Sequence, residues 1–321
     1  MYNKKNNFRL KIYWYLLAFI TLIFLSVHWL WWRVLTTDEA LNPMLVVFLR
    51  FFWGFLFLIL FLPLFTKKWD FTKLFKWKNK IFKNKNFWFS SIFFFFTLIT
   101  FNFATSFTSA SNVVLIQSMA PIIVALTTLI YYPKGSSNYN FRKIFFISVI
   151  ASIGSTLLVS DNSLLNQSGN NKIIWDLLAF FSMIFFAFFN FFYVELRKDF
   201  DKGNWLIITS SFLFVWLILS SPILIFYYES LFTLSQTAIY FILLISAWST
   251  WIAYFTRFLA GRYLSAITLI LIFNIVWITT MVVEYLYYWK TQNEITYKLY
   301  LWAILIISSI YYINYLSNSK K

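Results

Sequence analysis

Long runs of apolar residues dominate the pattern of hydrophobic and polar positions along this chain. A helix needs roughly 20 predominantly apolar residues to cross the hydrocarbon core of a bilayer, and ten runs reach or approach that length. They are Ile12–Trp32, Pro43–Phe65, Phe87–Phe107, Ala110–Tyr132, Ile144–Ser160, Ile173–Glu195, Trp205–Tyr228, Gln236–Thr256, Ser265–Trp289 and Leu299–Leu316. The pattern predicts an all-α polytopic membrane protein with ten transmembrane helices.

The two halves of the chain resemble each other. The letters IYWYLLAF in the first run resemble IIWDLLAF in the sixth, and YYPK at the end of the fourth run resembles YYWK at the end of the ninth. Both matches occur in the same order in each half, which favours a duplication. An odd number of spans in each copy makes the second copy cross in the opposite direction, and inverted repeats of this kind bind substrate near the midplane. We therefore expect two inverted five-helix repeats, residues 12–160 and 173–316.

Lysine and arginine are distributed unevenly between the runs. Of the 27 Lys and Arg residues, most lie at the termini or in loops that the order of the runs places on the same side. The other side receives only Arg33, Lys172, Lys290 and Lys298. Because cytoplasmic loops of membrane proteins carry the excess of positive charge, we expect both termini and the connector Thr66–Asn86 to be cytoplasmic. The predicted location is the cell (plasma) membrane, with multiple passes.

Composition narrows the chemistry further. The chain is 61% hydrophobic with a mean hydropathy of +0.71, so its net charge of +16 is better explained by lipid headgroups and orientation than by nucleic acid. With no Cys, one His and few acidic residues, we expect no disulfide, no metal site and no cofactor. The sequence contains no nucleophile elbow, zinc-protease motif or phosphate-binding glycine loop, so we expect no enzyme and no catalytic residue.

Polar residues inside the apolar runs are the candidates for a substrate pathway or gate. At about 1.5 Å per residue, five of them fall at one depth on the outer side: His28, Arg50, Asn102, Gln117 and Glu284. A charge in the membrane costs about 3 kcal/mol and usually faces the protein interior. Arg50 and Glu284 could form a fixed salt bridge, act as a gate or substrate contact, or extend to the headgroups.

The remaining candidates each have a structural alternative. His28 could sense protons or simply pack among tryptophans. Asn190 and Asn274 could form an inner polar ring or make helix–helix hydrogen bonds. Trp251 shares a predicted face with Trp248 and Tyr254, which could stack on a substrate or serve packing. Pro121 predicts a helix kink, either structural or lining a cavity.

Several segments carry a resemblance to a known family. They are FLRFFWGFLFLILFLP in the second run, FATSFTSASNVVLIQSMAPIIVAL across the third and fourth, WDLLAFFSMIFFAFFNFFYVELRK in the sixth, and RYLSAITLILIF entering the ninth. In order and spacing the chain resembles the EamA-like ten-helix carriers of the drug/metabolite transporter superfamily. The resemblance implies an inverted-repeat bundle that moves small metabolites by alternating access, with a central cavity lined by spans one to four and six to nine.

We therefore expect a secondary transporter for a small metabolite, with an amino acid or related zwitterion suggested by the charges of Arg50 and Glu284. The expected partners are a small-molecule substrate and the lipid bilayer; a coupling ion (proton or sodium) or an exchange substrate is left open, as is the oligomeric state. The alternative is a translocase for a lipid or lipid-linked intermediate built on the same fold.

Overall fold

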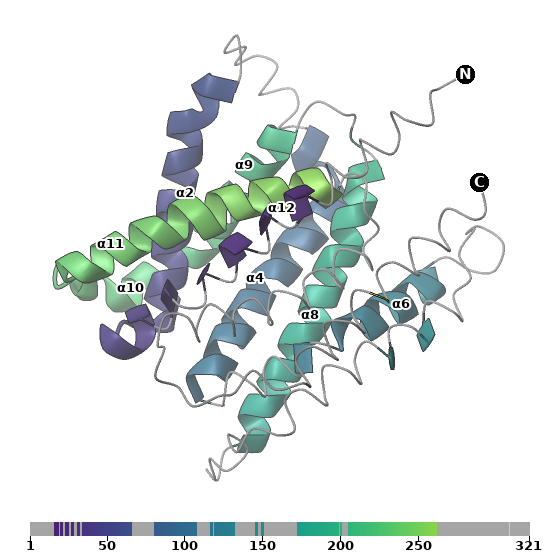
Figure 1. The fold of residues 1–321 in the computed structure, drawn as a ribbon, viewed down its shortest axis with the longest axis horizontal. Coiled ribbons are helices and arrows are strands. Elements are labelled where there is room, and N and C mark those ends of the chain that lie inside the picture. Colours follow the sequence, from purple (N-terminus) through teal and green to yellow (C-terminus); the bar gives the residue numbers. More distant parts are fainter. Residues whose placement is uncertain are drawn as a thin grey trace. The chain divides into compact units, whose positions relative to one another are not determined.

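The computed structural model describes part of the chain, drawn as coloured ribbon in Figure 1. It describes residues 16–18, 20–21, 23–25, 27–28, 31–32, 34–65, 80–107, 116–117, 119–131, 145–146, 149–150, 172–198, 200, 205–261 and 308. All regular secondary structure within these residues is helical, and none of them lies in a strand.

The named elements follow the order of the chain. They are η1 (Val34–Asp38), α2 (Pro43–Phe65), α4 (Lys85–Phe107), α6 (Ala120–Tyr131), α8 (Lys172–Lys198), α9 (Trp205–Ser220), α10 (Ile223–Tyr227), η3 (Glu229–Leu231), α11 (Gln236–Leu244), η4 (Ile245–Ile252) and α12 (Ala253–Gly261). The elements η1 and η4 are π-helical, and η3 is a 3₁₀-helix. The three elements α11, η4 and α12 follow one another without a break from Gln236 to Gly261.

Two helices begin at residues that suit a helix N-terminus. At the start of α2, the Asn42 side-chain oxygen accepts a hydrogen bond from the Met44 amide at 2.9 Å, and Pro43 occupies the first helical position. At the start of α4, the Asn84 side-chain oxygen accepts from the Asn86 amide at 2.8 Å. Asparagine satisfies an otherwise unpaired amide here, and proline loses nothing because its position needs no donor. The predicted helix at 43–65 is confirmed, and the one at 87–107 begins two residues earlier.

Four helical segments are long and apolar enough to cross a membrane: Pro43–Leu60, Lys85–Ala104, Leu177–Arg197 and Gln236–Arg257. Large apolar side chains such as Leu60, Ile130 and Phe226 lie on the surface of the described part of the chain. A soluble protein rarely exposes so much apolar surface, whereas lipid tolerates it. These features fit an all-α membrane protein.

One predicted segment is wrong in its extent. The run Trp205–Tyr228 was expected to form one helix, but α9 ends at Ser220 and α10 begins at Ile223. Pro222 lies at the break, where its missing N–H and its ring prevent a continuous helix. The predicted ninth helix, all of the tenth except residue 308, and most of the fifth lie outside the described residues.

The chain divides into two compact units. Unit 1 comprises residues 1–91 and 193–264, and unit 2 comprises residues 92–192 and 265–321. The first predicted repeat, 12–160, contributes to both units, and so does the second, 173–316. The compact units therefore differ from the predicted repeats, whose structural similarity stays a prediction.

In unit 1, α2 packs against η4 and α9, and the segment from α11 to α12 crosses α2 as one continuous ribbon (Figure 1). Trp216 of α9 is fully buried at the centre of this packing. Its ring centroid lies 5.4 Å from Phe51 and 5.3 Å from Tyr254, and its Nε1–H donates to the Ser91 carbonyl at 3.2 Å. One indole therefore contacts residues from three other helices.

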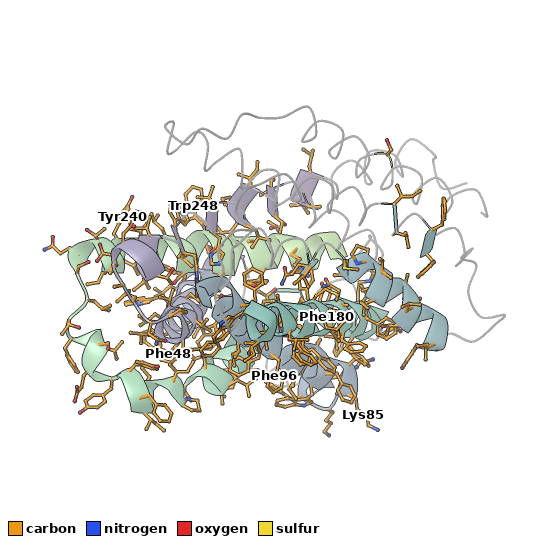
Figure 2. All side chains as sticks on the ribbon, turned by 90° about the horizontal axis from the view of Figure 1, so that it is seen from below. Phe48, Lys85, Phe96, Phe180, Tyr240 and Trp248 are labelled. Atoms are coloured by element: carbon orange, nitrogen blue, oxygen red, sulfur yellow. The ribbon has the colours of Figure 1, made fainter. Side chains whose placement is uncertain are left out.

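In unit 2, α4 and α8 pack through phenylalanine rings. Phe93 lies 5.2 Å from Phe188 and 5.7 Å from Phe192, and Phe94 lies 4.6 Å from Phe189 (ring centroids). Some rings at this contact also reach the surface: Phe96 and Phe180 are both exposed, and Figure 2 labels them on α4 and α8. The rings supply the broad apolar contact that holds these two helices together.

Candidate functional site

The most strongly polar cluster in the described residues surrounds Arg50 in unit 1. The Arg50 side chain leaves the middle of α2 and is only 2% exposed. Its Nε–H donates to Thr250 Oγ1 of η4 at 3.0 Å, and its Nη1 lies 3.2 Å from His28 Nε2. The Tyr254 hydroxyl of α12 also hydrogen-bonds to the guanidinium. Arg50 thus points into the protein and does not extend to the headgroups.

The hydrogen bonds around His28 determine its tautomer. A guanidinium nitrogen can only donate, so His28 Nε2 must accept from Arg50 and carry no proton. A neutral imidazole then carries its proton on Nδ1, which lies 2.9 Å from Ser249 Oγ and donates to it. Ser249 in turn donates to the Ile245 carbonyl at 2.7 Å. A directed chain of donors therefore runs from Arg50 through His28 and Ser249 to the backbone of η4.

The partners of Arg50 in the described part of the chain are all uncharged. Thr250, His28 and Tyr254 take up three of the five N–H groups of the guanidinium. The Phe51 ring adds a cation–π contact, with its centroid 5.4 Å from Arg50 Cζ. Buried charges in proteins are normally paired with an opposite charge. Arg50 is thus a buried cation held by neutral acceptors.

A second buried guanidinium lies near the first. Arg257 of α12 is 2% exposed and interacts electrostatically with Tyr254 and Tyr193. Tyr254 interacts with both guanidiniums. Arg257 lies just beyond the predicted run Gln236–Thr256, but α12 continues past it to Gly261. The apolar run ends at Thr256, but the helix does not.

The π-helical geometry of η4 brings its hydroxyls to Arg50 and His28. Ser246 and Ser249 donate back to the Ile242 and Ile245 carbonyls at 2.6 and 2.7 Å, which satisfies both hydroxyls locally. Gly54 of α2 allows close approach, because a Cβ there would lie 2.9 Å from Thr250 Cγ2. Single π-helical turns inside α-helices often occur at functional sites.

The same geometry corrects the predicted aromatic face. Trp248, Trp251 and Tyr254 were expected to share one face of an α-helix. In the structure Trp248 is 46% exposed whereas Tyr254 is 4% exposed. The wider turn of a π-helix rotates residues relative to α-helical spacing, so Trp248 points outward, as Figure 2 shows beside Tyr240. Trp251 is half-buried.

The other predicted site residues lie in unit 2 or outside the described residues. Gln117 Nε2 donates to Ser182 Oγ at 3.1 Å, and Ser182 donates to the Thr97 carbonyl at 3.1 Å. Asn102 is buried, and Asn190 donates to the Phe186 carbonyl at 2.6 Å within its own helix. Pro121 lies in the first turn of α6, shortly after a turn at Met119. Asn274 and Glu284 lie outside the described residues.

Sequence reasoning missed Ser249 and Thr250, and it considered Tyr254 only as a stacking or packing aromatic and not as a hydrogen-bond partner of Arg50. Hydroxyls within apolar helices usually bond to their own backbone, so Ser and Thr there give little signal of a site. The available signal was the spacing of Thr250, Tyr254 and Arg257, which places three polar groups on about one face of a helix.

Comparison with known proteins supports the fold and leaves the function open. No family model matches the sequence, and no curated protein matches it. Solved structures do resemble the chain; one, described as "Crystal structure of protein", is similar with a TM-score of 0.69 and 12% sequence identity, over 92% of this chain and 94% of that chain. At this identity, the likeness shows a shared fold over nearly the whole length.

Proposed function

We propose that this protein is a secondary transporter that moves a small solute across the cell membrane by alternating access. The observation that carries the proposal is the cluster of His28, Arg50, Ser249 and Thr250, buried among helices apolar enough to span a membrane. Ionisable residues are expensive within a membrane, and they usually mark a path for a substrate or ion.

A purely structural role explains the cluster less well. A salt bridge between helices would pair Arg50 with a carboxylate, whereas its described partners are neutral. Neutral acceptors compensate a buried guanidinium incompletely. The Arg50 charge is incompletely compensated because its described partners are neutral. A site that receives an anion only during part of a transport cycle accounts for this. Whether Arg50 also pairs with Glu284, one of the alternatives that the sequence leaves open, is untested, since Glu284 lies outside the described residues.

The proposed architecture has ten spans arranged as two inverted repeats, residues 12–160 and 173–316, with both termini in the cytoplasm. The matching segments of the two halves and the one-sided distribution of Lys and Arg support it. Superposition of the two halves over all ten spans tests the repeats. We expect a pseudo-two-fold axis in the membrane plane; a good superposition only about the membrane normal would contradict the inverted arrangement.

Reconstitution of the purified full-length protein tests the transport function. Proteoliposomes should take up at least one labelled solute from a panel of amino acids, sugars, nucleosides and amines, faster than protein-free vesicles. The same vesicles, prepared with fluorescent phospholipid, should not redistribute it between leaflets. Movement of lipid without movement of any soluble metabolite would favour the translocase, and movement of neither would refute the proposal.

A further inference from the structure

We propose that the Arg50 cluster binds a carboxylate group of the transported solute, and that His28 takes up a proton when the carboxylate binds. The inference rests on the proposed transport function and adds the chemical class of its substrate. Its starting point is the buried guanidinium of Arg50, whose described hydrogen-bond partners are all neutral.

The geometry of the guanidinium suits a carboxylate. Three of its five N–H groups bond to Thr250, His28 and Tyr254, which leaves donors for a further acceptor. Arginine binds a carboxylate through two parallel hydrogen bonds, and charge-assisted bonds of this kind are roughly twice as strong as neutral ones. A carboxylate can therefore replace the His28 ring as the partner of Nη1.

When a carboxylate takes the place of His28 as the acceptor of Arg50, the His28 ring can become protonated. While Arg50 donates to Nε2, a proton on that nitrogen would face another donor at 3.2 Å. Once the guanidinium donates to the carboxylate instead, Nε2 can take a proton from water and donate it to the same carboxylate. The Nδ1 proton stays on its bond to Ser249. One proton and one negative charge then enter together, so the net charge of the cluster is unchanged.

The surroundings of His28 contain few other ionisable groups among the described residues. Arg50 faces it from α2, and the segment from η4 to α12 adds Tyr254 and Arg257, which interact with each other. The sequences of η4 and α9 contain no ionisable residue, and the single one in α11, Tyr240, is exposed. Within the described residues, the Arg50 guanidinium donates to His28 Nε2, so a change in that hydrogen bond alters whether Nε2 can take a proton.

The test uses the full-length protein in proteoliposomes that contain a trapped pH-sensitive dye. The probes are a mixture of labelled L-amino acids and the matched amines, which lack the carboxylate. We expect uptake of amino acids with acidification of the lumen, and at least tenfold slower uptake of the amines. Uptake of amines at the same rate, or uptake of neither probe, would overturn the inference. The transport function is refuted separately, only if no solute of the wider panel with sugars and nucleosides is taken up.

Three variants separate the two parts of the inference. Arg50→Gln should lower amino-acid uptake at least tenfold, because it removes the positive charge and the guanidinium N–H groups that would bind the carboxylate. His28→Gln keeps an acceptor for Arg50 but cannot be protonated, so amino-acid exchange should persist without acidification. Lys80→Gln removes an exposed cation outside the cluster and should behave as the wild type.

Each variant has a result that contradicts the proposal. Wild-type uptake by Arg50→Gln would exclude the carboxylate site, and undiminished acidification with His28→Gln would exclude its proton role. Rates are normalised to folded protein measured by size-exclusion chromatography. If Arg50→Gln does not fold, the comparison of amino acids with amines on the wild type still decides the substrate class.

Discussion

At the scale of single residues, the contact between Gly54 and Thr250 determines how closely α2 and η4 can approach each other at the site. Thr250 accepts a hydrogen bond from Arg50, and its methyl group fills the space that a side chain at position 54 would need. Since Arg50 lies one helical turn before Gly54 on α2, the spacing between α2 and η4 also sets the length of the Arg50–Thr250 bond.

Gly54→Ala should therefore destabilise the protein by about 1–3 kcal/mol, the usual cost of overpacking. The added Cβ would lie 2.9 Å from Thr250 Cγ2 and 3.3 Å from its Cβ, so the helices must separate. Thermal unfolding in detergent measures the effect. Addition of Thr250→Ser removes Cγ2 but keeps the hydroxyl, so the double variant should recover part of the loss. No recovery would show that the contact is not the cause.

The residues of the site differed in how far the sequence could predict them. His28 and Arg50 could be recognised because ionisable groups are rare in apolar runs. Thr250 and Ser249 could not, because a hydroxyl in a helix usually bonds to its own backbone. Arg257 could not be recognised as a buried helical residue, because the run of apolar residues ends at Thr256 although the helix continues to Gly261.

At the scale of the elements, the hydrogen bonds of one hydroxyl add a polar contact to the apolar packing between α4 and α8. Ser182 of α8 accepts from Gln117 and donates to the Thr97 carbonyl of α4. In lipid, such polar contacts add to close packing as a source of helix association. The bounds of α2 could be predicted because Asn42 and Pro43 mark its start, whereas the π-helical turn of η4 follows from packing that no local sequence signal reports.

Ser182→Ala should lower stability by about 0.5–1 kcal/mol, because the Gln117 amide and the Thr97 carbonyl lose a buried partner. The matched control is Ser221→Ala, since the exposed Ser221 hydroxyl bonds only to the nearby Ile218 carbonyl. Chemical unfolding in detergent compares the two variants. Equal losses would mean that the Ser182 contacts contribute nothing between helices.

At the scale of the whole molecule, the distribution of charge predicts orientation, and the absence of cysteine makes that prediction simple to test. The all-helical class could be predicted because the apolar runs are long. The division into two compact units could not, because it combines segments far apart in the sequence, residues 1–91 with 193–264.

Single cysteines test the predicted orientation. In intact cells a membrane-impermeant thiol reagent should label Gln167→Cys, predicted to be extracellular, and should not label Lys80→Cys in the cytoplasmic connector. Permeabilised cells provide the control, since both cysteines should then react. The reverse pattern in intact cells would show that the orientation is inverted.

The measurement that tests alternating access most directly is the reactivity of Thr250→Cys from each side of the membrane. Thr250 bonds to Arg50 at the centre of the proposed site, so a carrier should expose it to water from both sides in turn. The cysteine-free parent gives the background. We expect labelling by an impermeant reagent both in right-side-out and in inside-out vesicles, slowed by a transported solute. Labelling from one side alone, or from neither, would contradict the proposed transport mechanism.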